Sequence, residues 1–129
     1  MTRPLTTIAS ICVAALLASS AARADDCPCG SDRMPRFLRC LLVPQEFAGA
    51  DFRPVCRCHD ACYDTLGADK RACDQQYLDN VLNACNCSRR PVMCRIVGRM
   101  MHMSIVLGGS GAYRRAQANA EAAYYCYPE

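Results

Sequence analysis

Apolar residues recur with the period of an α-helix along most of the chain, and no stretch alternates with the period of a β-strand. A first helix is expected from Asp51 as N-cap, with Pro54 in an early position that tolerates proline, to Gly67 as the residue that closes it. Asp69 is expected to cap a second helix over Lys70 to Asn86. Its apolar stripe is Tyr77, Leu78, Val81 and Leu82. The pattern predicts an all-α fold built on two antiparallel core helices.

Two further helices are expected after Asn86. One opens at Ser88 and Pro91 and runs to about Leu107, where glycines at 108, 109 and 111 end it. The core stripe of this helix is predicted to be Val92, Ile96, Met100, Met103 and Leu107. The alanine-rich segment 112–127 predicts another helix, with Cys126 tying down its end.

Residues 33–43 are basic and apolar by turns and predict a short helix that ends before Pro44. Two interpretations of this segment stay open. Its basic and apolar side chains form a membrane-docking face, or the helix packs inward as an ordinary loop-helix element. The residues concerned are Arg33, Arg36 and Arg39 beside Phe37, Leu41 and Leu42.

The first 24 residues have the pattern of a secretory signal peptide. Arg3 precedes an apolar run from Ile8 to Leu17, and Ala22, Arg23 and Ala24 form an A-x-A cleavage site. The run is too short to span a bilayer. The expected organisation is a signal peptide over 1–24 and one domain over 25–129, exported to an extracellular or periplasmic space.

Cysteine content supports an exported scaffold. The chain has 12 cysteines in 129 residues, and only Cys12 lies in the leader. So high a fraction in a short exported chain is typical of disulfide-stapled domains. Eleven is odd, so at least one thiol is free or pairs between chains. Arg3 and Arg23 lie in the expected signal peptide, so 13 of the 15 basic residues remain beside 12 acidic ones. A chain with so small a net charge lacks the basic surface expected of a nucleic-acid-binding protein. A monomer is expected.

The candidate reactive residues lie on the first expected helix and at the start of the second. Positions i, i+3, i+4 and i+7 form one helical stripe, occupied here by Cys56, His59, Asp60 and Tyr63. Cys58 and Cys62 fall on a different stripe. On the second helix, Asp74 lies within the apolar arc, where a carboxylate is costly unless it is hydrogen-bonded. The most obvious partner is His59 on the facing helix.

These residues resemble the active-site signature of secreted phospholipase A2. The resemblance covers about Cys29 to Cys87 and is carried by Cys56-x-x-His59-Asp60-x-Cys62-Tyr63, followed by Cys73-Asp74. It implies calcium-dependent hydrolysis of the sn-2 acyl ester of glycerophospholipids, with a phospholipid membrane or vesicle surface as partner. The products would be a fatty acid and a lysophospholipid.

The resemblance also implies a role for each matched residue. His59 would be the general base that activates water, and Asp74 would hold its other ring nitrogen and fix the tautomer. Tyr63 would hydrogen-bond within the Asp74 network. Calcium would be bound by the Asp60 carboxylate and by backbone carbonyls of a glycine-containing loop, here Cys29, Gly30 and Ser31. Two disulfides are implied, Cys29–Cys56 and Cys62–Cys73.

Three other interpretations are compatible with the sequence. Between Gly30 and His59 there is no clear second or third glycine of the family's calcium loop, which leaves a catalytically silent phospholipase-like binding protein as the alternative. The cysteines of C-R-C-H-x-x-C, with Cys85 and Cys87, are a weaker zinc candidate, because a helical Cys56 and Cys58 point in nearly opposite directions. Met100, Met101, His102 and Met103 are a still weaker copper candidate.

Overall fold

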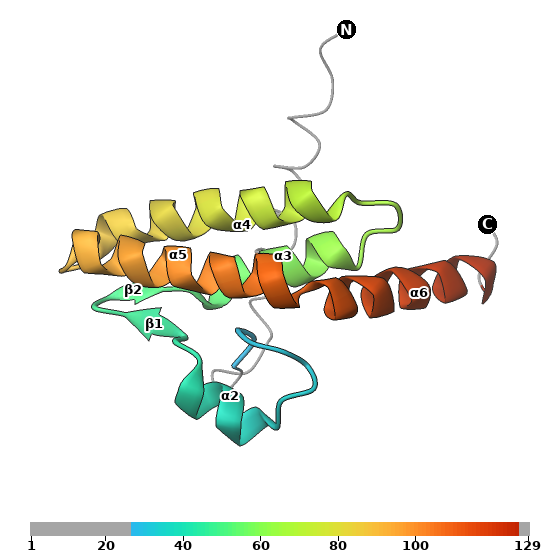
Figure 1. Cartoon of the computed structure of the whole chain (residues 1–129), viewed down its shortest axis with the longest axis horizontal. Coiled ribbons are helices and arrows are strands. Elements are labelled where there is room, and N and C mark those ends of the chain that lie inside the picture. Colours follow the sequence, from blue (N-terminus) through green and yellow to red (C-terminus); the bar gives the residue numbers. More distant parts are fainter. Residues whose placement is uncertain (1–26, 127–129) are drawn as a thin grey trace, which may run out of the picture.

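The structure is a computed structural model, and it describes residues 27–126. The expected signal peptide over 1–24 therefore lies outside the described residues. Within 27–126 the chain forms five α-helices and one two-stranded hairpin (Figure 1). The elements are α2 (Arg36–Leu42), β1 (Glu46–Phe47), β2 (Ala50–Asp51), α3 (Arg53–Tyr63), α4 (Lys70–Ala84), α5 (Pro91–Gly108) and α6 (Ser110–Cys126), with a 3₁₀ turn (Cys85–Cys87) before α5.

Helices α3 and α4 are the two antiparallel core helices expected from the sequence, joined by the turn on the right of Figure 1. Gly67 does not close α3 as expected, because the helix already ends at Tyr63 with Asp64 as its C-cap residue. Gly67 lies further along the turn at a φ of +77°, a conformation that glycine adopts without strain. Asp69 caps α4 as predicted, since its Oδ1 accepts a hydrogen bond of 2.9 Å from the Ala72 amide. Asp51 is not the N-cap residue of α3, which is Phe52, but its carboxylate accepts a hydrogen bond from the Arg53 amide at 3.0 Å.

Helix α5 packs along α4, but not through the predicted stripe. The five residues of that stripe are 47% to 78% exposed, so their assignment to the core is wrong: Val92, Ile96, Met100, Met103 and Leu107. The opposite face is buried, around Cys94 and Gly98. Cys94 is bonded to Cys85 at the end of α4, and Gly98 lies so close to Val81 that a Cβ there would be 3.1 Å from both of its methyl groups. These two contacts fix the rotation of α5 about its own axis.

Helix α6 continues from α5 after a break at Gly109 and extends beyond the rest of the bundle (Figure 1). No residue of α6 is buried, and hydrogen bonds hold it to the α3–α4 turn. The Gln117 amide donates to the carbonyls of Tyr63 and Thr65 and accepts from the Gly67 amide. Cys126 has an exposed free thiol, so the expectation that it ties down the end of this helix is wrong. Cys87 is a second exposed free thiol.

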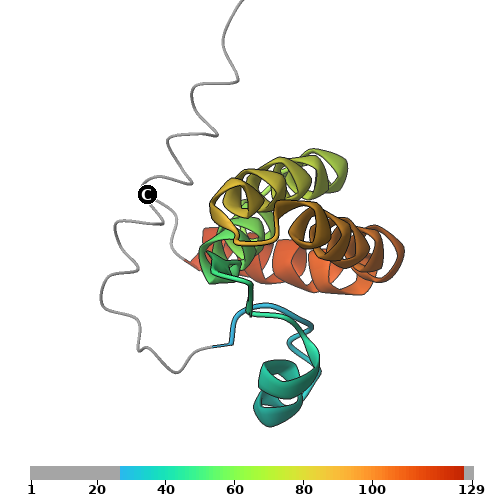
Figure 2. The ribbon, with the colours of Figure 1, turned by 90° about the vertical axis from the view of Figure 1, so that its left-hand side faces the viewer.

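Helix α2 lies apart from the bundle of α3, α4 and α5 when the molecule is viewed from its end (Figure 2). Its large apolar side chains are 64% to 75% exposed, so the inward-packing interpretation is wrong for Phe37, Leu41 and Leu42. The segment is attached by disulfides rather than by a core: Cys27–Cys40 closes the N-terminal strip onto α2, and Cys29–Cys56 joins the strip to α3.

Two more bridges complete the described set, Cys62–Cys73 between α3 and α4 and Cys85–Cys94 between α4 and α5. Each consecutive pair of helices from α3 to α5 is thus covalently linked. Both pairings that the resemblance implied, Cys29–Cys56 and Cys62–Cys73, are formed. A bridge of this kind typically contributes about 2–4 kcal/mol, which matters in a domain with so small a core.

The hairpin β1–β2 was not expected, because each strand has only two residues. Its turn places Ala48 at φ +47° and Gly49 at φ +93°, and the Ala48 carbonyl accepts hydrogen bonds from the Arg89 amide and the Ser88 hydroxyl. The hairpin therefore anchors the start of α5. No helix within residues 27–126 is both long enough and apolar enough to cross a bilayer.

Candidate active site

One cavity of about 400 Å³ is lined by the candidate reactive residues that the sequence predicted on α3. All four members of the stripe on α3 line it: Cys56, His59, Asp60 and Tyr63. Cys62 and Cys58 line a different cavity, on the other side of α3, as their different stripe predicted. Helical periodicity thus sorted the side chains of α3 correctly between its two sides.

Around the reactive side chains the cavity wall is largely apolar. Residues from the N-terminal strip, from both ends of α2 and from α5 complete it, including Pro28, Met34, Val43, Met101 and Ile105. Tyr77 of α4 also lines the cavity, and its hydroxyl is buried without a hydrogen-bond partner in the described part of the chain. An apolar cavity with a few polar groups at one side is typical of sites that bind a small or amphipathic ligand.

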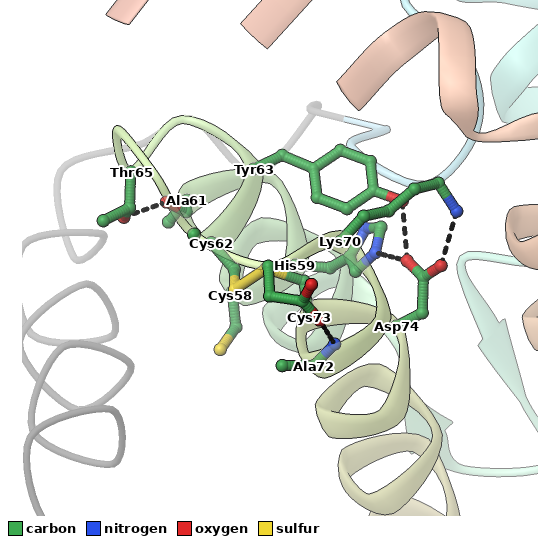
Figure 3. Close-up of a disulfide and its surroundings, with 12 residues drawn as sticks. Cys58, His59, Ala61, Cys62, Tyr63, Thr65, Lys70, Ala72, Cys73 and Asp74 are labelled. Atoms are coloured by element: carbon green, nitrogen blue, oxygen red, sulfur yellow. Dashed lines mark hydrogen bonds and ion pairs between the residues drawn. A yellow bond between two sulfur atoms is a disulfide. The ribbon is translucent and has the colours of Figure 1, made fainter. Parts of the chain in front are cut away.

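His59 and Asp74 form the pair that the sequence predicted across the α3–α4 interface. The His59 Nε2 is 2.9 Å from Asp74 Oδ1, and both side chains are more than nine-tenths buried (Figure 3). The Tyr63 hydroxyl donates to the same oxygen at 2.6 Å, the hydrogen bond that the resemblance implied. His59 Nδ1 has no hydrogen-bond partner among residues 27–126, while its ring lines the cavity.

The two groups have pKa values shifted in the directions that favour a neutral imidazole beside a carboxylate. Burial lowers the pKa of His59, and the nearby Lys70 charge lowers it further, against the opposing effect of Asp74. Burial alone would raise the pKa of Asp74, but hydrogen bonds from Lys70, Tyr63 and His59 outweigh it and leave that pKa below its ordinary value. Asp74 therefore stays ionised, and His59 is the partner that remains neutral near pH 7.

Asp60 lies beside His59 on the cavity wall, but its carboxylate has no hydrogen bond or ion pair with any described residue. Desolvation of the carboxylate by the surrounding protein raises the pKa of Asp60 to about 7, and the negative charge of Asp64 raises it further. The side chain still reaches solvent, which moderates the shift in size but not in direction. A cation bound beside the Asp60 carboxylate would stabilise its ionised form and so oppose both effects on its pKa.

The loop expected to complete a calcium site borders the same cavity through Gly30 and Ser31, whereas Cys29 is buried behind them. Gly30 has a φ of +111°, as its glycine suggested. The Cys29 carbonyl accepts a hydrogen bond from the Gln45 amide at 3.1 Å, and the Ser31 carbonyl accepts one from the Met34 amide at 3.0 Å. A carbonyl oxygen has two lone pairs, so each retains one for a cation. One carboxylate with loop carbonyls and water fits the oxygen ligands that calcium prefers.

The residues of the zinc candidate and of the copper candidate do not come together as a metal site within the described part of the chain. Cys56 and Cys85 are consumed in disulfides, and residues 27–126 hold no group of three or more histidine, cysteine or acidic side chains able to share an ion. Met100 and Met103 are exposed on the outer side of α5, whereas Met101 lines the cavity, so the three sulfurs do not converge.

Sequence reasoning missed two features of the site. Lys70 binds the second oxygen of Asp74 at 2.6 Å, and the i,i+4 spacing of a lysine and an aspartate on one helix was the signal for it. Gly109 lies where a Cβ would be 3.0 Å from the Tyr63 hydroxyl. No local pattern pointed to that contact, because it joins α3 to the α5–α6 break.

No protein-family model, no curated protein and no solved structure matches this chain. The function is therefore inferred from the residues and their geometry.

Proposed function

We propose that the protein is an exported, calcium-dependent hydrolase of the phospholipase A2 kind, which cleaves the sn-2 acyl ester of glycerophospholipids. The observation that carries the proposal is the buried His59–Asp74 pair, 2.9 Å apart, on the wall of an apolar cavity. Beside it lies Asp60, whose carboxylate has no partner within residues 27–126. The disulfides, which persist in oxidising compartments, support export.

In this mechanism His59 acts as general base. Asp74 accepts the hydrogen bond from Nε2–H, which leaves the Nδ1 lone pair free to take a proton from water as the water attacks the ester carbonyl carbon. The imidazolium that forms is stabilised by the Asp74 carboxylate and later gives its proton to the departing glycerol oxygen. The apolar cavity wall provides a place for the acyl chain and limits competing water.

Asp60, with the backbone carbonyls of Cys29, Gly30 and Ser31, would hold the calcium ion. When bound, the ion supplies positive charge that stabilises the oxyanion developing on the ester carbonyl. The protein's own contribution is to place the Asp60 carboxylate one residue after His59, on the same helical stripe, so that cation and base meet in one cavity.

Two exposed apolar surfaces flank the cavity and support a lipid surface as the partner. The α2 surface consists of Phe37, Leu41 and Leu42. The α5 surface consists of the five exposed residues of its apolar stripe: Val92, Ile96, Met100, Met103 and Leu107. Helix α5 has two exposed arginines, Arg95 and Arg99, and no acidic residue. A helix with an exposed apolar stripe beside basic residues is suited to an anionic membrane interface. We therefore expect stronger binding to anionic vesicles than to neutral ones.

Lipid binding is tested separately from catalysis, with the inactive His59→Gln protein and sedimentation of vesicles. A variant carrying Met100→Glu and Leu107→Glu should lose most of its binding to anionic vesicles. Ala118→Glu adds an acid at an exposed position of α6 and is the matched control that should bind nearly as well as the parent. Equal binding by the double variant and the parent would exclude α5 as the docking surface.

Catalysis is tested by fatty-acid release from phospholipid vesicles, with calcium and with a chelator. The wild type should release fatty acid only with calcium, and His59→Gln should be inactive. His102→Gln, a change to the other histidine of the chain, should retain activity because His102 does not line the cavity. No release by the correctly oxidised wild type would leave the catalytically silent binding protein as the remaining interpretation.

A further inference from the structure

Lys70 completes a ring of three donors around the Asp74 carboxylate, and the proposed reaction assigns it no role. Its Nζ donates to Asp74 Oδ2 at 2.6 Å, whereas Oδ1 accepts from the Tyr63 hydroxyl at 2.6 Å and lies 2.9 Å from His59 Nε2, which donates to it in the Nε2–H tautomer. Figure 3 shows the three side chains converging on the carboxylate from different directions. Each oxygen of Asp74 therefore has its own donors.

This division of the oxygens matters because the terminal torsion of an aspartate is soft. An aspartate carboxylate bound through only one oxygen rotates over a broad range. The Lys70–Oδ2 contact holds the second oxygen, so the Oδ1 lone pairs stay directed at His59 and Tyr63. The lysine charge also balances a carboxylate whose side chain is only 6% exposed, which keeps Asp74 ionised and therefore an acceptor.

We propose that Lys70 is a positioning residue that holds the Asp74 carboxylate, so that His59 keeps its proton on Nε2 and presents Nδ1 to the cavity. Its catalytic consequence rests on the proposed function, but its effect on the tautomer of His59 does not. The ordinary interpretation is a lysine–aspartate pair at i,i+4 that only stabilises the helix. Such a pair would affect stability and leave the imidazole unchanged.

The tautomer is measured by nitrogen NMR of histidine in the full mature chain. The protein has only two histidines, so a His102→Gln background leaves the signals of His59 alone. The parent should show the Nε2–H form. Lys70→Met, which keeps the apolar stem of the side chain, should show a mixture of the two tautomers, and Lys70→Arg should restore the parent spectrum. Arg71→Met removes the same charge at an exposed neighbouring position and should match the parent.

An unchanged His59 spectrum in Lys70→Met would overturn the proposal. If the methionine variant does not fold, Lys70→Gln removes the charge with a polar side chain, and the same shift toward mixed tautomers is expected. Retention of the parent spectrum in that variant would likewise overturn it.

Kinetics supply the second readout. Loss of a group that orients a reacting side chain typically costs roughly 10–100-fold in activity. We expect Lys70→Met to lose kcat by about tenfold or more, with KM nearly unchanged, and Lys70→Arg to recover most of the loss. A change in KM alone, or a kcat equal to that of Arg71→Met, would contradict a positioning role. A wild type without hydrolysis would refute the proposed function, and the NMR result would still decide the role of Lys70.

Discussion

The face of α5 that packs on α4 can be tested with two glycines of the same helix. A Cβ at Gly98 would lie 3.1 Å from both methyl groups of Val81, whereas nothing lies within 4 Å of a Cβ at Gly108. Alanine is more favourable than glycine in a helix by about 1 kcal/mol, but forcing an extra carbon into a packed interface costs about 1–3 kcal/mol. Gly98→Ala should therefore destabilise the protein by about 1 kcal/mol, and Gly108→Ala should stabilise it by up to about 1 kcal/mol.

Val81 provides the internal control. Val81→Ala removes two buried methyl groups and should itself cost about 2 kcal/mol. In that background the space beside Gly98 is open, so Gly98→Ala should become stabilising, a coupling of about 2 kcal/mol between the two positions. The assay is urea unfolding followed by circular dichroism with the disulfides intact, where 1 kcal/mol moves the midpoint by roughly 0.3–1 M. If Gly98→Ala and Gly108→Ala stabilised the protein equally and additively, the observed rotation of α5 about its axis would be wrong. The predicted apolar stripe of α5 would then be its buried face.

Three further predictions concern the site. A Cβ at Gly109 would lie 2.4 Å from the Ile105 carbonyl oxygen and 3.0 Å from the Tyr63 hydroxyl, so Gly109→Ala should shift both the α5–α6 break and the Tyr63 hydroxyl and lower kcat by about tenfold, as vesicle hydrolysis assays would measure. Calcium should raise the thermal unfolding midpoint of the wild type, equivalent to about 2.7 kcal/mol at a hundredfold excess over Kd, and should leave Asp60→Asn unchanged. The pKa of Asp74 is lower in the folded than in the unfolded chain, so its stabilisation is complete above its ordinary value of 3.8 and is lost as pH falls through the folded value. In chelator, Asp74→Asn should therefore flatten the loss of stability below about pH 4, and the exposed Asp79→Asn should not; equal slopes in urea titrations would contradict this.

Local periodicity was enough to predict which side of α3 lines the cavity and which residue of α4 it contacts. His59 and Asp60 are placed by the geometry of a single helix, and Asp74 is a carboxylate that must be paired wherever it is buried. The site could be anticipated because each step needed only the neighbours along one helix, plus one contact between consecutive helices. The cap at Asp69 was predictable for the same reason.

The orientation of α5 could not be derived in this way, because the helix is apolar on two sides. Val92 and Met100 mark one apolar side, and Met101 and Ile105 mark the other, so periodicity alone does not choose between them. The choice is made by Cys94, through its bond to Cys85, and by long-range contacts that no local pattern contains. Choosing the longer row of large side chains led to the wrong face.

The role of Gly109 illustrates a second limit. A run of glycines at the end of a helix predicts only that the helix stops, and that prediction held for Gly108 as the last residue of α5. That Gly109 must also make room for the Tyr63 hydroxyl depends on how α5 and α6 fold back over α3. Helix ends are local features, whereas the contacts of a helix end are not.

The most direct test of the central claim uses a phospholipid with two different acyl chains. The mature, oxidised protein is mixed with vesicles of this lipid in the presence of calcium, and the released fatty acid and the lysophospholipid are identified by mass spectrometry. The proposed reaction releases the sn-2 chain alone and leaves the sn-1 lysophospholipid, and the His59→Gln variant should release neither chain. Release of the sn-1 chain, release unaffected by that substitution, or an intact lipid would contradict it.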